Sequence, residues 1–362
     1  MSGSQDPRRP STHDARPLRR RPLGVVIRPL LLLAGVALLA GCGGSGGDDP
    51  EPTTTSATGP PASLTLTLDF VPNAVHSGLY LAQRRGLFGR EGVDLRIRVP
   101  GTGSDNVKAL STGRTDLAIM DIHDVALAQQ EGARLVAVGA LVQRPLASLV
   151  AAPEIARPRD LEGRRVGVTG LPSDDAAVDQ IVRGDGGDPR RVRRVTIGFE
   201  SVKSVLSGRV QAATAFWNAE GVALRIRRPR TRIFRLDEFG APRYPELLIV
   251  TTPEALRREQ PAIERFLRAA AQGTQEAATA STAQSAAVVD ALSAGAGEQA
   301  IDPQTAADQL AAVRPALLDA DGAALTIDRA AMRRWAAWEA RVGITRRAPD
   351  VDALVWSGAP GR

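Results

Sequence analysis

Residues 64–95 read LTLTLDFVPNAVHSGLYLAQRRGLFGREGVDL, and this stretch decides the fold class. Its alternating start predicts a short β-strand. The polar turn 70–76 follows, and the segment after the turn has the apolar spacing of an amphipathic helix. A turn of small residues then leads into a second strand. In an open α/β sheet, ligands dock where a strand ends and a helix begins. The polar turn is therefore the first candidate for a binding site.

Strands and helices continue to alternate along the rest of the chain. The pattern in 64–144 is typical of a mostly parallel sheet. Two segments, 145–152 and 244–250, are expected to be extended connectors, and the alternation restarts after the first of them. From residue 261 onward the sequence is alanine-rich and helical. Further strands are expected at 93–99, 115–120, 135–142, 164–170, 191–199 and 210–217.

The sequence thus predicts an α/β protein of two lobes joined by two extended crossovers, with a ligand cleft between them. Residues 64–148 and 247–362 are assigned to lobe one, and residues 149–246 to lobe two. Interfaces between domains are common sites for small ligands. A hinged clamp of this kind would close around its ligand.

The N-terminus is interpreted as a targeting segment. Residues 16–28 are rich in arginine, and the apolar run PLLLLAGVALLAG at 29–41 precedes Cys42. A positive flank before a short apolar core indicates a secretory signal. Leu39-Ala40-Gly41-Cys42 resembles the lipobox of bacterial lipoproteins, which implies cleavage before Cys42 and diacylation of its thiol. A plain signal peptide or a buried apolar helix is the alternative.

A lipid anchor at Cys42 would place the protein outside the cytoplasm, attached to the membrane. Residues 43–63 contain mostly Gly, Ser, Thr, Pro and acidic residues, a composition that predicts a flexible tether. Residues 1–42 are then the lipoprotein signal peptide. An anchor and a tether in front of an α/β body indicate a surface-displayed binding protein.

Charge and cysteine usage exclude several classes of function. The chain carries +6, but seven arginines and two aspartates precede Cys42, so that the remainder carries only about +1. A nucleic-acid-binding protein would need a basic face, and we expect no nucleic-acid partner. Cys42 is the only cysteine. The mature chain therefore has no disulfide, no cysteine-based metal site and no thiol nucleophile.

Several motifs resemble those of one family of transport proteins. LDFVPNAVHSGLYLAQRRGLFGREGVDL, GTGSDNVKALSTGRTDLAI, EGRRVGV and SVLSGRVQAATAFWNAEG are similar to segments of the ThiY-like substrate-binding proteins of ABC transporters. These are related to the fungal thiamine-pyrimidine synthases. The resemblance covers about residues 64–290. It implies the type II periplasmic binding protein fold, a thiamine-precursor pyrimidine as ligand (formylamino- or hydroxymethyl-pyrimidine), and an ABC permease as partner.

The chain departs from that family at two places. Phe70 stands where the family usually has Trp after the first strand's aspartate, which keeps riboflavin, sulfonate or nitrate open as alternative solutes. The fungal synthases carry a cysteine cluster near the second crossover, whereas residues 241–246 read APRYPE. A pyrimidine synthase-like enzyme is therefore the remote alternative. We expect a protein with no catalytic residues and no cofactor.

The candidate site residues follow from the needs of a flat, amino-bearing ring. Trp217 ends a predicted strand and offers the largest stacking surface, although it could also be a core residue. Glu220 could accept hydrogen bonds from a ring amino group or simply complement a helix dipole. Asn73 is also a plausible helix N-cap. The full set of candidate ligand-binding residues is Trp217, Glu220, Asn218, Asn73, His76, Phe70, Tyr80, Asp121, His123, Asp124, Ser173 and Tyr244.

A metal site is not expected. His76, His123 and Asp121 are conceivable ligands, but their spacing matches no recognised metal motif.

Overall fold

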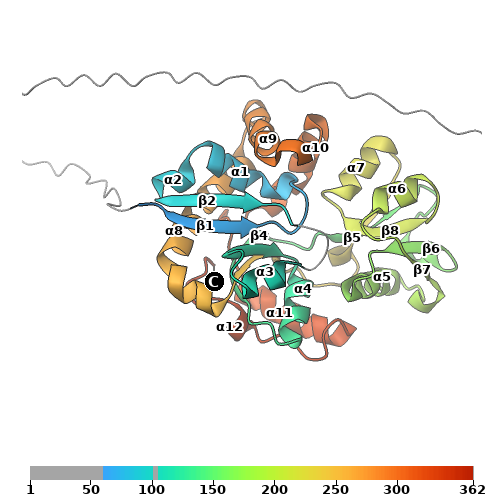
Figure 1. Ribbon diagram of the computed structural model, residues 1–362. Coiled ribbons are helices and arrows are strands. Elements are labelled where there is room, and N and C mark those ends of the chain that lie inside the picture. The colour runs from blue at the N-terminus through green and yellow to red at the C-terminus, as the bar shows by residue number, and fades with distance from the viewer. Residues whose placement is uncertain (1–59, 101–104, 362) are drawn as a thin grey trace, which may run out of the picture. The chain divides into compact units, whose positions relative to one another are not determined.

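The computed structural model describes residues 60–100 and 105–361, which belong to a unit spanning residues 56–362. Two five-stranded sheets form the cores of two α/β lobes (Figure 1). The predictions for the signal peptide, for Cys42 and for nearly all of the tether concern residues outside this described part.

The first sheet has the strand order β2-β1-β3-β10-β4. The strand β1 pairs in parallel with both β2 and β3, and Leu64 lies opposite Leu95. The strand β10 is antiparallel to both of its neighbours, and Ile249 lies opposite Ile119. The strands are β1 (Ala62–Thr67), β2 (Val93–Arg98), β3 (Leu117–Met120), β4 (Val136–Val142) and β10 (Glu246–Thr251).

Helices from both ends of the described chain pack around the first sheet (Figure 1). The early helices are the 3-10 helix η1 (Ala74–His76), α1 (Ser77–Arg84), α2 (Leu87–Arg90), α3 (Asp105–Ser111) and α4 (Ile122–Gln130). The C-terminal helices are α8 (Pro253–Thr279), α9 (Thr282–Ala296), α10 (Pro303–Val313), α11 (Arg329–Val342) and α12 (Val351–Leu354).

The second sheet repeats the topology of the first, with the order β7-β6-β8-β5-β9. The strand β6 is parallel to β7 and β8, and β5 is antiparallel to β8 and β9. Its strands are β5 (Ala147–Ala151), β6 (Arg165–Val168), β7 (Arg193–Thr196), β8 (Ala212–Phe216) and β9 (Arg232–Arg235). Its helices are α5 (Pro172–Gly184), α6 (Ser201–Leu206) and α7 (Glu220–Arg227), with the short 3-10 helix Leu236–Glu238 after β9.

The two-lobe α/β prediction is confirmed, and four of the five strands in each sheet run in the same direction, as expected for a mostly parallel sheet. Two details were wrong. Each sheet contains one antiparallel strand, β10 or β5, and these two strands replace the expected connectors at 244–250 and 145–152. The expected turn before the second strand contains the short helix α2. An apolar run that follows a crossover looks like a connector, yet it can insert into the next sheet and bury both of its faces.

The chain passes between the sheets after β4 and again before β10. We propose that these crossovers divide the chain as the sequence predicts, with 64–148 and 247–362 in lobe one and 149–246 in lobe two. The helix α10 contacts both η1 of the first lobe and α7 of the second. It therefore lies where the lobes meet.

Two glycines allow α1 and α8 to pack very closely. A Cβ added to Gly78 would lie 2.3 Å from the hydroxyl oxygen of Thr274, and one on Gly273 would lie 2.3 Å from the carbonyl oxygen of Gly78. These distances are far below contact, so that side chains are excluded at both positions. The close crossing fixes α1, and with it the turn that precedes α1, against the long helix α8.

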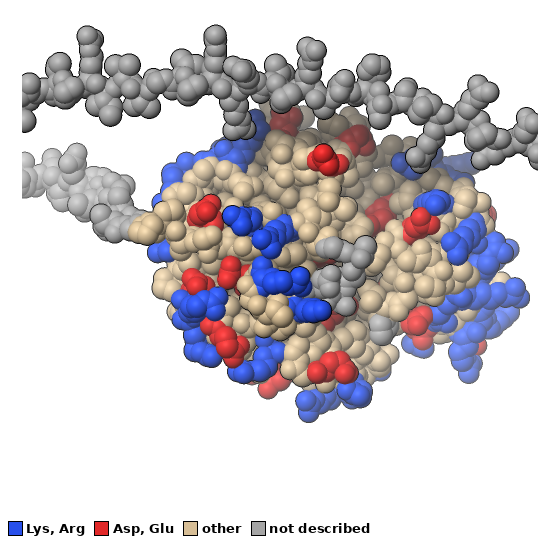
Figure 2. All heavy atoms as spheres, in the orientation of Figure 1, with Lys and Arg blue, Asp and Glu red and all other residues tan. Residues whose placement is uncertain are grey.

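The described surface shows both signs of charge. Arginines and lysines are interspersed with acidic residues over the face in Figure 2. Several exposed arginines of the second lobe are paired, including Arg190 with Asp188 at 3.0 Å and Arg157 with Asp185 at 2.5 Å. Within the described ranges, the helices are too short or too polar to cross a membrane.

Candidate functional site

The turn after β1 is held by its own side chains. Asn73 caps η1 by accepting a hydrogen bond from the backbone N–H of Val75 at 3.2 Å, and its amide donates to the carbonyl of Val71 at 3.1 Å. His76 is fully buried, and its Nδ1 accepts from the N–H of Asn73 at 3.2 Å. Its Nε2 therefore carries the proton and donates to Asp69, 2.8 Å away. Asn73 is the N-cap that the sequence suggested. The hydrogen bond from His76 fixes the orientation of the Asp69 carboxylate.

Trp217 lies directly after β8, where it packs against the first crossover. Its indole N–H donates to the carbonyl of Pro145 at 2.8 Å, and its ring is only 3% exposed. The guanidinium of Arg235 lies 4.0 Å from the ring centroid, and that of Arg144 lies 5.7 Å away. Burial and the charge of Arg144 lower the pKa of Arg235. In this conformation Arg235 covers the ring that a ligand would stack on.

Two polar side chains shortly after Trp217, those of Asn218 and Glu220, are buried in an unfavourable state. Asn218 is 1% exposed, and neither its amide oxygen nor its amide nitrogen has a hydrogen-bond partner. Glu220 begins α7 and accepts from the N–H of Phe216 at 3.1 Å. Burial raises the pKa of Glu220, and the charge of Asp69 raises it further. A buried, unpartnered amide costs about 1–3 kcal/mol, so Asn218 is a candidate for binding an external group.

The two lobes come together at these residues. Asp69 of lobe one is close enough for its charge to act on Glu220 of lobe two. The rings of Phe70 and Phe199, again one from each lobe, have centroids 5.8 Å apart. Gln309 of α10 donates to the carbonyl of Ala219 at 3.4 Å. The turn after β1 and the turn after β8 therefore form one group, which contains Phe70, Asn73, His76, Trp217, Asn218 and Glu220.

A second group of candidate residues surrounds His123, which is buried in the first turn of α4. Its Nδ1 lies 2.8 Å from a carboxylate oxygen of Glu339, and its Nε2 lies 3.0 Å from the hydroxyl of Tyr244. Tyr244 stacks on Trp338, with 6.1 Å between ring centroids. Burial alone would lower the pKa of His123, but the charges of Glu339 and Asp121 raise it to about 10. His123 is therefore an imidazolium that ties lobe one to the second crossover.

Several carboxyl groups lie around that imidazolium. Asp121 caps α4 by accepting from the N–H of His123 at 2.7 Å. Burial and the charge of Asp121 raise the pKa of Asp124 to about 7, and the same two causes raise the pKa of Glu246. The charge of Asp174 in lobe two also raises the pKa of Asp124, and burial raises the pKa of Asp174 itself. Asp121, Asp124, His123 and Tyr244 are thus brought together.

Two predicted site residues belong to neither hydrogen-bonded group. Tyr80 is buried between α1 and α9, and its ring packs closely on Gly295. A Cβ added to Gly295 would lie 2.1 Å from Cδ1 of the Tyr80 ring. Burial raises the pKa of Tyr80 to about 12. Ser173 is half-buried in the first turn of α5, next to Asp174.

Sequence reasoning missed residues that complete both groups. Asp69 had a visible signal, because it directly precedes the polar turn at the end of β1. Phe199 follows β7 as an exposed aromatic in the stretch TIGFES. Arg235 ends β9, a strand that was not predicted. Glu339 lies 216 residues after its partner His123, and no local pattern connects them.

Metal ligation has no structural basis in the described residues. Over residues 60–100 and 105–361, no group of three or more His, Cys, Asp or Glu is arranged to hold a metal ion.

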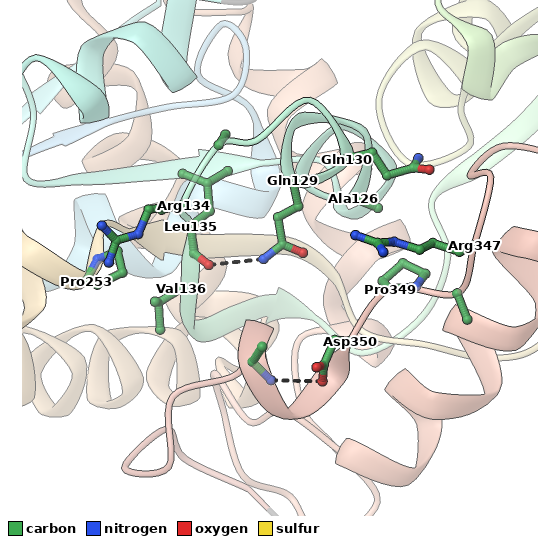
Figure 3. A pocket seen from close by; sticks show the side chains of 13 residues that line it. Ala126, Gln129, Gln130, Arg134, Leu135, Val136, Pro253, Arg347, Pro349 and Asp350 are labelled. Atoms are coloured by element: carbon green, nitrogen blue, oxygen red, sulfur yellow. Dashed lines mark hydrogen bonds between the residues drawn. The ribbon is translucent and has the colours of Figure 1, made fainter.

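A pocket of about 550 Å³ lies elsewhere on lobe one, between α4, the loop before β4 and the start of α12 (Figure 3). Its polar walls are largely satisfied within the protein. Gln129 donates to the carbonyl of Leu135 at 3.2 Å, Arg134 pairs with Glu254 at 3.0 Å, and Asp350 caps α12. None of the predicted site residues lines it. We place the candidate site between the lobes because unpartnered and strongly perturbed polar groups gather there.

Comparisons with known proteins agree with this architecture. The aliphatic sulphonate binding protein SsuA of Escherichia coli has a similar structure, with a TM-score of 0.64 and 16% identity over 83% of this chain and 94% of that protein. The fold is therefore that of the periplasmic substrate-binding proteins, as predicted.

The family follows from the sequence. The model of the NMT1/THI5-like family matches residues 73–282, more than half of the chain. The formylaminopyrimidine-binding protein of Halalkalibacterium halodurans is 30% identical over 67% of this chain and 72% of its own length. The 4-amino-5-hydroxymethyl-2-methylpyrimidine phosphate synthase THI12 of Saccharomyces cerevisiae is 22% identical over 58% of this chain and 66% of its own length. This chain belongs to the NMT1/THI5-like family, and the predicted resemblance is confirmed.

Proposed function

We propose that this protein is the extracytoplasmic solute-binding component of an ABC importer, and that it is not an enzyme. Its solute is a thiamine-precursor pyrimidine, such as a formylamino- or hydroxymethyl-pyrimidine, which it binds between the lobes and delivers to the permease. The relative named as a formylaminopyrimidine-binding protein supports this solute class. The structural observation that carries the proposal is the unpartnered amide of Asn218 beside the buried carboxyl of Glu220.

The chemistry of these two side chains suits an aminopyrimidine. Such a ring presents an amino donor next to a ring-nitrogen acceptor. The amide of Asn218 offers an acceptor and a donor side by side. Burial raises the pKa of Glu220, and its carboxyl, when protonated, also offers one donor and one acceptor in a plane. Either group can therefore make a two-point contact with the edge of the ring.

Stacking on Trp217 requires a rearrangement. The ring is 3% exposed, and Arg235 lies over it. A bound pyrimidine would take the place of the Arg235 guanidinium, which is also planar and lies 4.0 Å from the centroid. Phe70 would contribute a second aromatic surface from lobe one.

Isothermal titration calorimetry with a formylaminopyrimidine tests the proposal. We expect binding that Asn218→Ala and Glu220→Ala each weaken at least about 10-fold, the effect of leaving a polar ligand atom unpaired. Glu200→Ala is the matched control, because this exposed carboxylate of the same lobe pairs with Lys203 at 3.1 Å. Failure of the wild-type protein to bind the pyrimidine would refute the solute, and unchanged affinity in both variants would refute the site.

An anionic solute is the second candidate, because two arginines lie close to the Trp217 ring. Titrations with taurine and nitrate, and with riboflavin as the third alternative, separate these classes. The synthase alternative requires turnover, and the second crossover sequence 241–246 has no cysteine. Pyrimidine binding without product formation supports a binding protein, whereas formation of a pyrimidine product would refute the non-enzymatic assignment.

We also propose that diacylation of Cys42 anchors the protein to the outer face of the cell membrane. The lipobox-like sequence at residues 39–42 supports this anchor. Labelling of expressing cells with a fatty acid should mark the wild-type protein, and Cys42→Ala should be unlabelled. Labelling that survives in Cys42→Ala would refute the assignment of the anchor.

A further inference from the structure

Large apolar side chains are exposed after the carboxyl ends of strands in both sheets. In the described residues, exposed large hydrophobics are found shortly after the carboxyl ends of β1, β6 and β7, where they are Val71, Leu171 and Phe199. Phe199 is 64% exposed, the highest value among them. Ile226 is a further example, but it lies on α7. Three of these side chains therefore lie on the edge where ligands dock in an α/β sheet.

One of them reaches across to the other lobe. The rings of Phe199 in lobe two and Phe70 in lobe one have centroids 5.8 Å apart, with an angle of 41° between their planes. Phe70 directly follows Asp69, the carboxylate that acts on Glu220. We propose that Phe70 and Phe199 form an aromatic latch, which holds the lobes closed over the ligand and sets how slowly it leaves.

The exposure of Phe199 argues for this role and against a role in folding. A ring with about two thirds of its surface in water adds little to the core of its own lobe. Its contact with Phe70 exists only while the lobes are together, so the pair stabilises the closed arrangement relative to an open one. Aromatic pairs of this geometry contribute enough to change an equilibrium about 2- to 12-fold.

The latch can be tested without any ligand. In the full chain with Cys42→Ser, spin labels are placed at Asp94→Cys on lobe one and Arg209→Cys on lobe two, two exposed sites. Pulsed electron resonance then measures the distribution of distances between the lobes. Phe199→Ala should increase the ratio of open to closed molecules about 2- to 12-fold. Ile226→Ala, which removes an exposed apolar side chain from the same lobe, should leave this ratio unchanged. An identical distribution in wild type and Phe199→Ala would overturn the latch.

A second measurement concerns ligand release and rests on the proposed function. With a formylaminopyrimidine as the probe, Phe199→Ala should speed dissociation about 2- to 12-fold with little change in the association rate. The double variant Phe70→Ala/Phe199→Ala should be no worse than Phe70→Ala alone, because the contact is already lost. Additive effects would overturn the latch. If the pyrimidine does not bind at all, the proposed function fails, and the spin-label distances still decide whether the latch exists.

Discussion

The buried pair of His123 and Glu339 predicts that stability falls as the pH rises above neutral. The pKa of His123 is about 10 in the folded protein and 6.5 as its ordinary value, because the charge and hydrogen bond of Glu339 outweigh burial. A group whose pKa is higher in the folded state contributes its full stabilisation below the unfolded pKa. That contribution is then lost as the pH rises towards the folded pKa. The window therefore runs from about 6.5 to about 10.

The size of the effect follows from the two pKa values. One pKa unit corresponds to about 1.4 kcal/mol, so that the full difference for His123 corresponds to about 5 kcal/mol. Between about pH 6 and about pH 9, about 3 kcal/mol of the free energy of unfolding should be lost through this one group. Replacing Glu339 by Gln keeps the shape of the side chain and removes the charge that stabilises the imidazolium. The variant should therefore be less stable than wild type near pH 6, by about 3–5 kcal/mol.

Urea unfolding at several pH values measures the effect. The stability difference between wild type and Glu339→Gln should shrink as the pH rises from about 6 to about 9, by at most about 3 kcal/mol, because Asp121 and Glu246 also raise the pKa of His123 and remain in the variant. Glu131→Gln is the control, because its carboxylate is 78% exposed, and it should show no such trend. The chain has three histidines, so imidazole signals can be followed by NMR. If every imidazole titrates below about pH 7.5, the reasoning about His123 is refuted.

Three further predictions use the same unfolding and calorimetric measurements. Gly273→Ala should destabilise the fold by about 1–3 kcal/mol, because its Cβ would lie 2.3 Å from the carbonyl oxygen of Gly78. Gly89→Ala is the control and should not destabilise the fold in this way, because no atom lies within 4 Å of the added Cβ. Asp124→Asn should become more stable relative to wild type as the pH rises from about 4 to about 8. The reason is that the pKa of Asp124 is raised to about 7 in the folded protein, so that its charge is unfavourable there above the unfolded pKa. A stability difference that stays constant with pH would contradict this. Asn218→Leu should change the free energy of unfolding of the free protein by less than about 1 kcal/mol, or raise it, and should abolish pyrimidine binding. A large loss of stability would mean that the amide has hydrogen-bond partners in the folded protein.

Local patterns in the sequence were enough to predict the two-lobe α/β fold and to point to some residues of the candidate site. Alternation of strand and helix reveals the α/β class because each helix repeats at 3.6 residues and each strand at two. The end of β1 and the end of β8 were recognisable, since a buried apolar run gives way to polar residues at Asp69 and again at Asn218. These turns carry most of the interlobe group.

Contacts between residues that lie far apart in the sequence could not be predicted from local patterns. The strands β5 and β10 look like connectors because their antiparallel insertion depends on neighbours from another part of the chain. Arg235 covers Trp217 only because β9 pairs beside β5. His123 pairs with the carboxylate of Glu339 on α11, 216 residues later in the chain. Each of these contacts depends on the tertiary fold rather than on a local pattern.

The distribution of unfavourable groups supports the proposed binding site between the lobes. Asn218 leaves both amide atoms unpartnered, and Glu220 is held at a raised pKa by burial and by Asp69. A chain optimised for stability alone would place apolar residues at these positions, because an unpartnered buried amide costs about 1–3 kcal/mol. The same groups cost nothing extra once a ligand supplies the missing donors and acceptors. At the proposed site, the stability given up in the free protein would therefore become affinity for a solute whose hydrogen-bonding edge matches these groups, and a solute that leaves them unpaired would bind much more weakly.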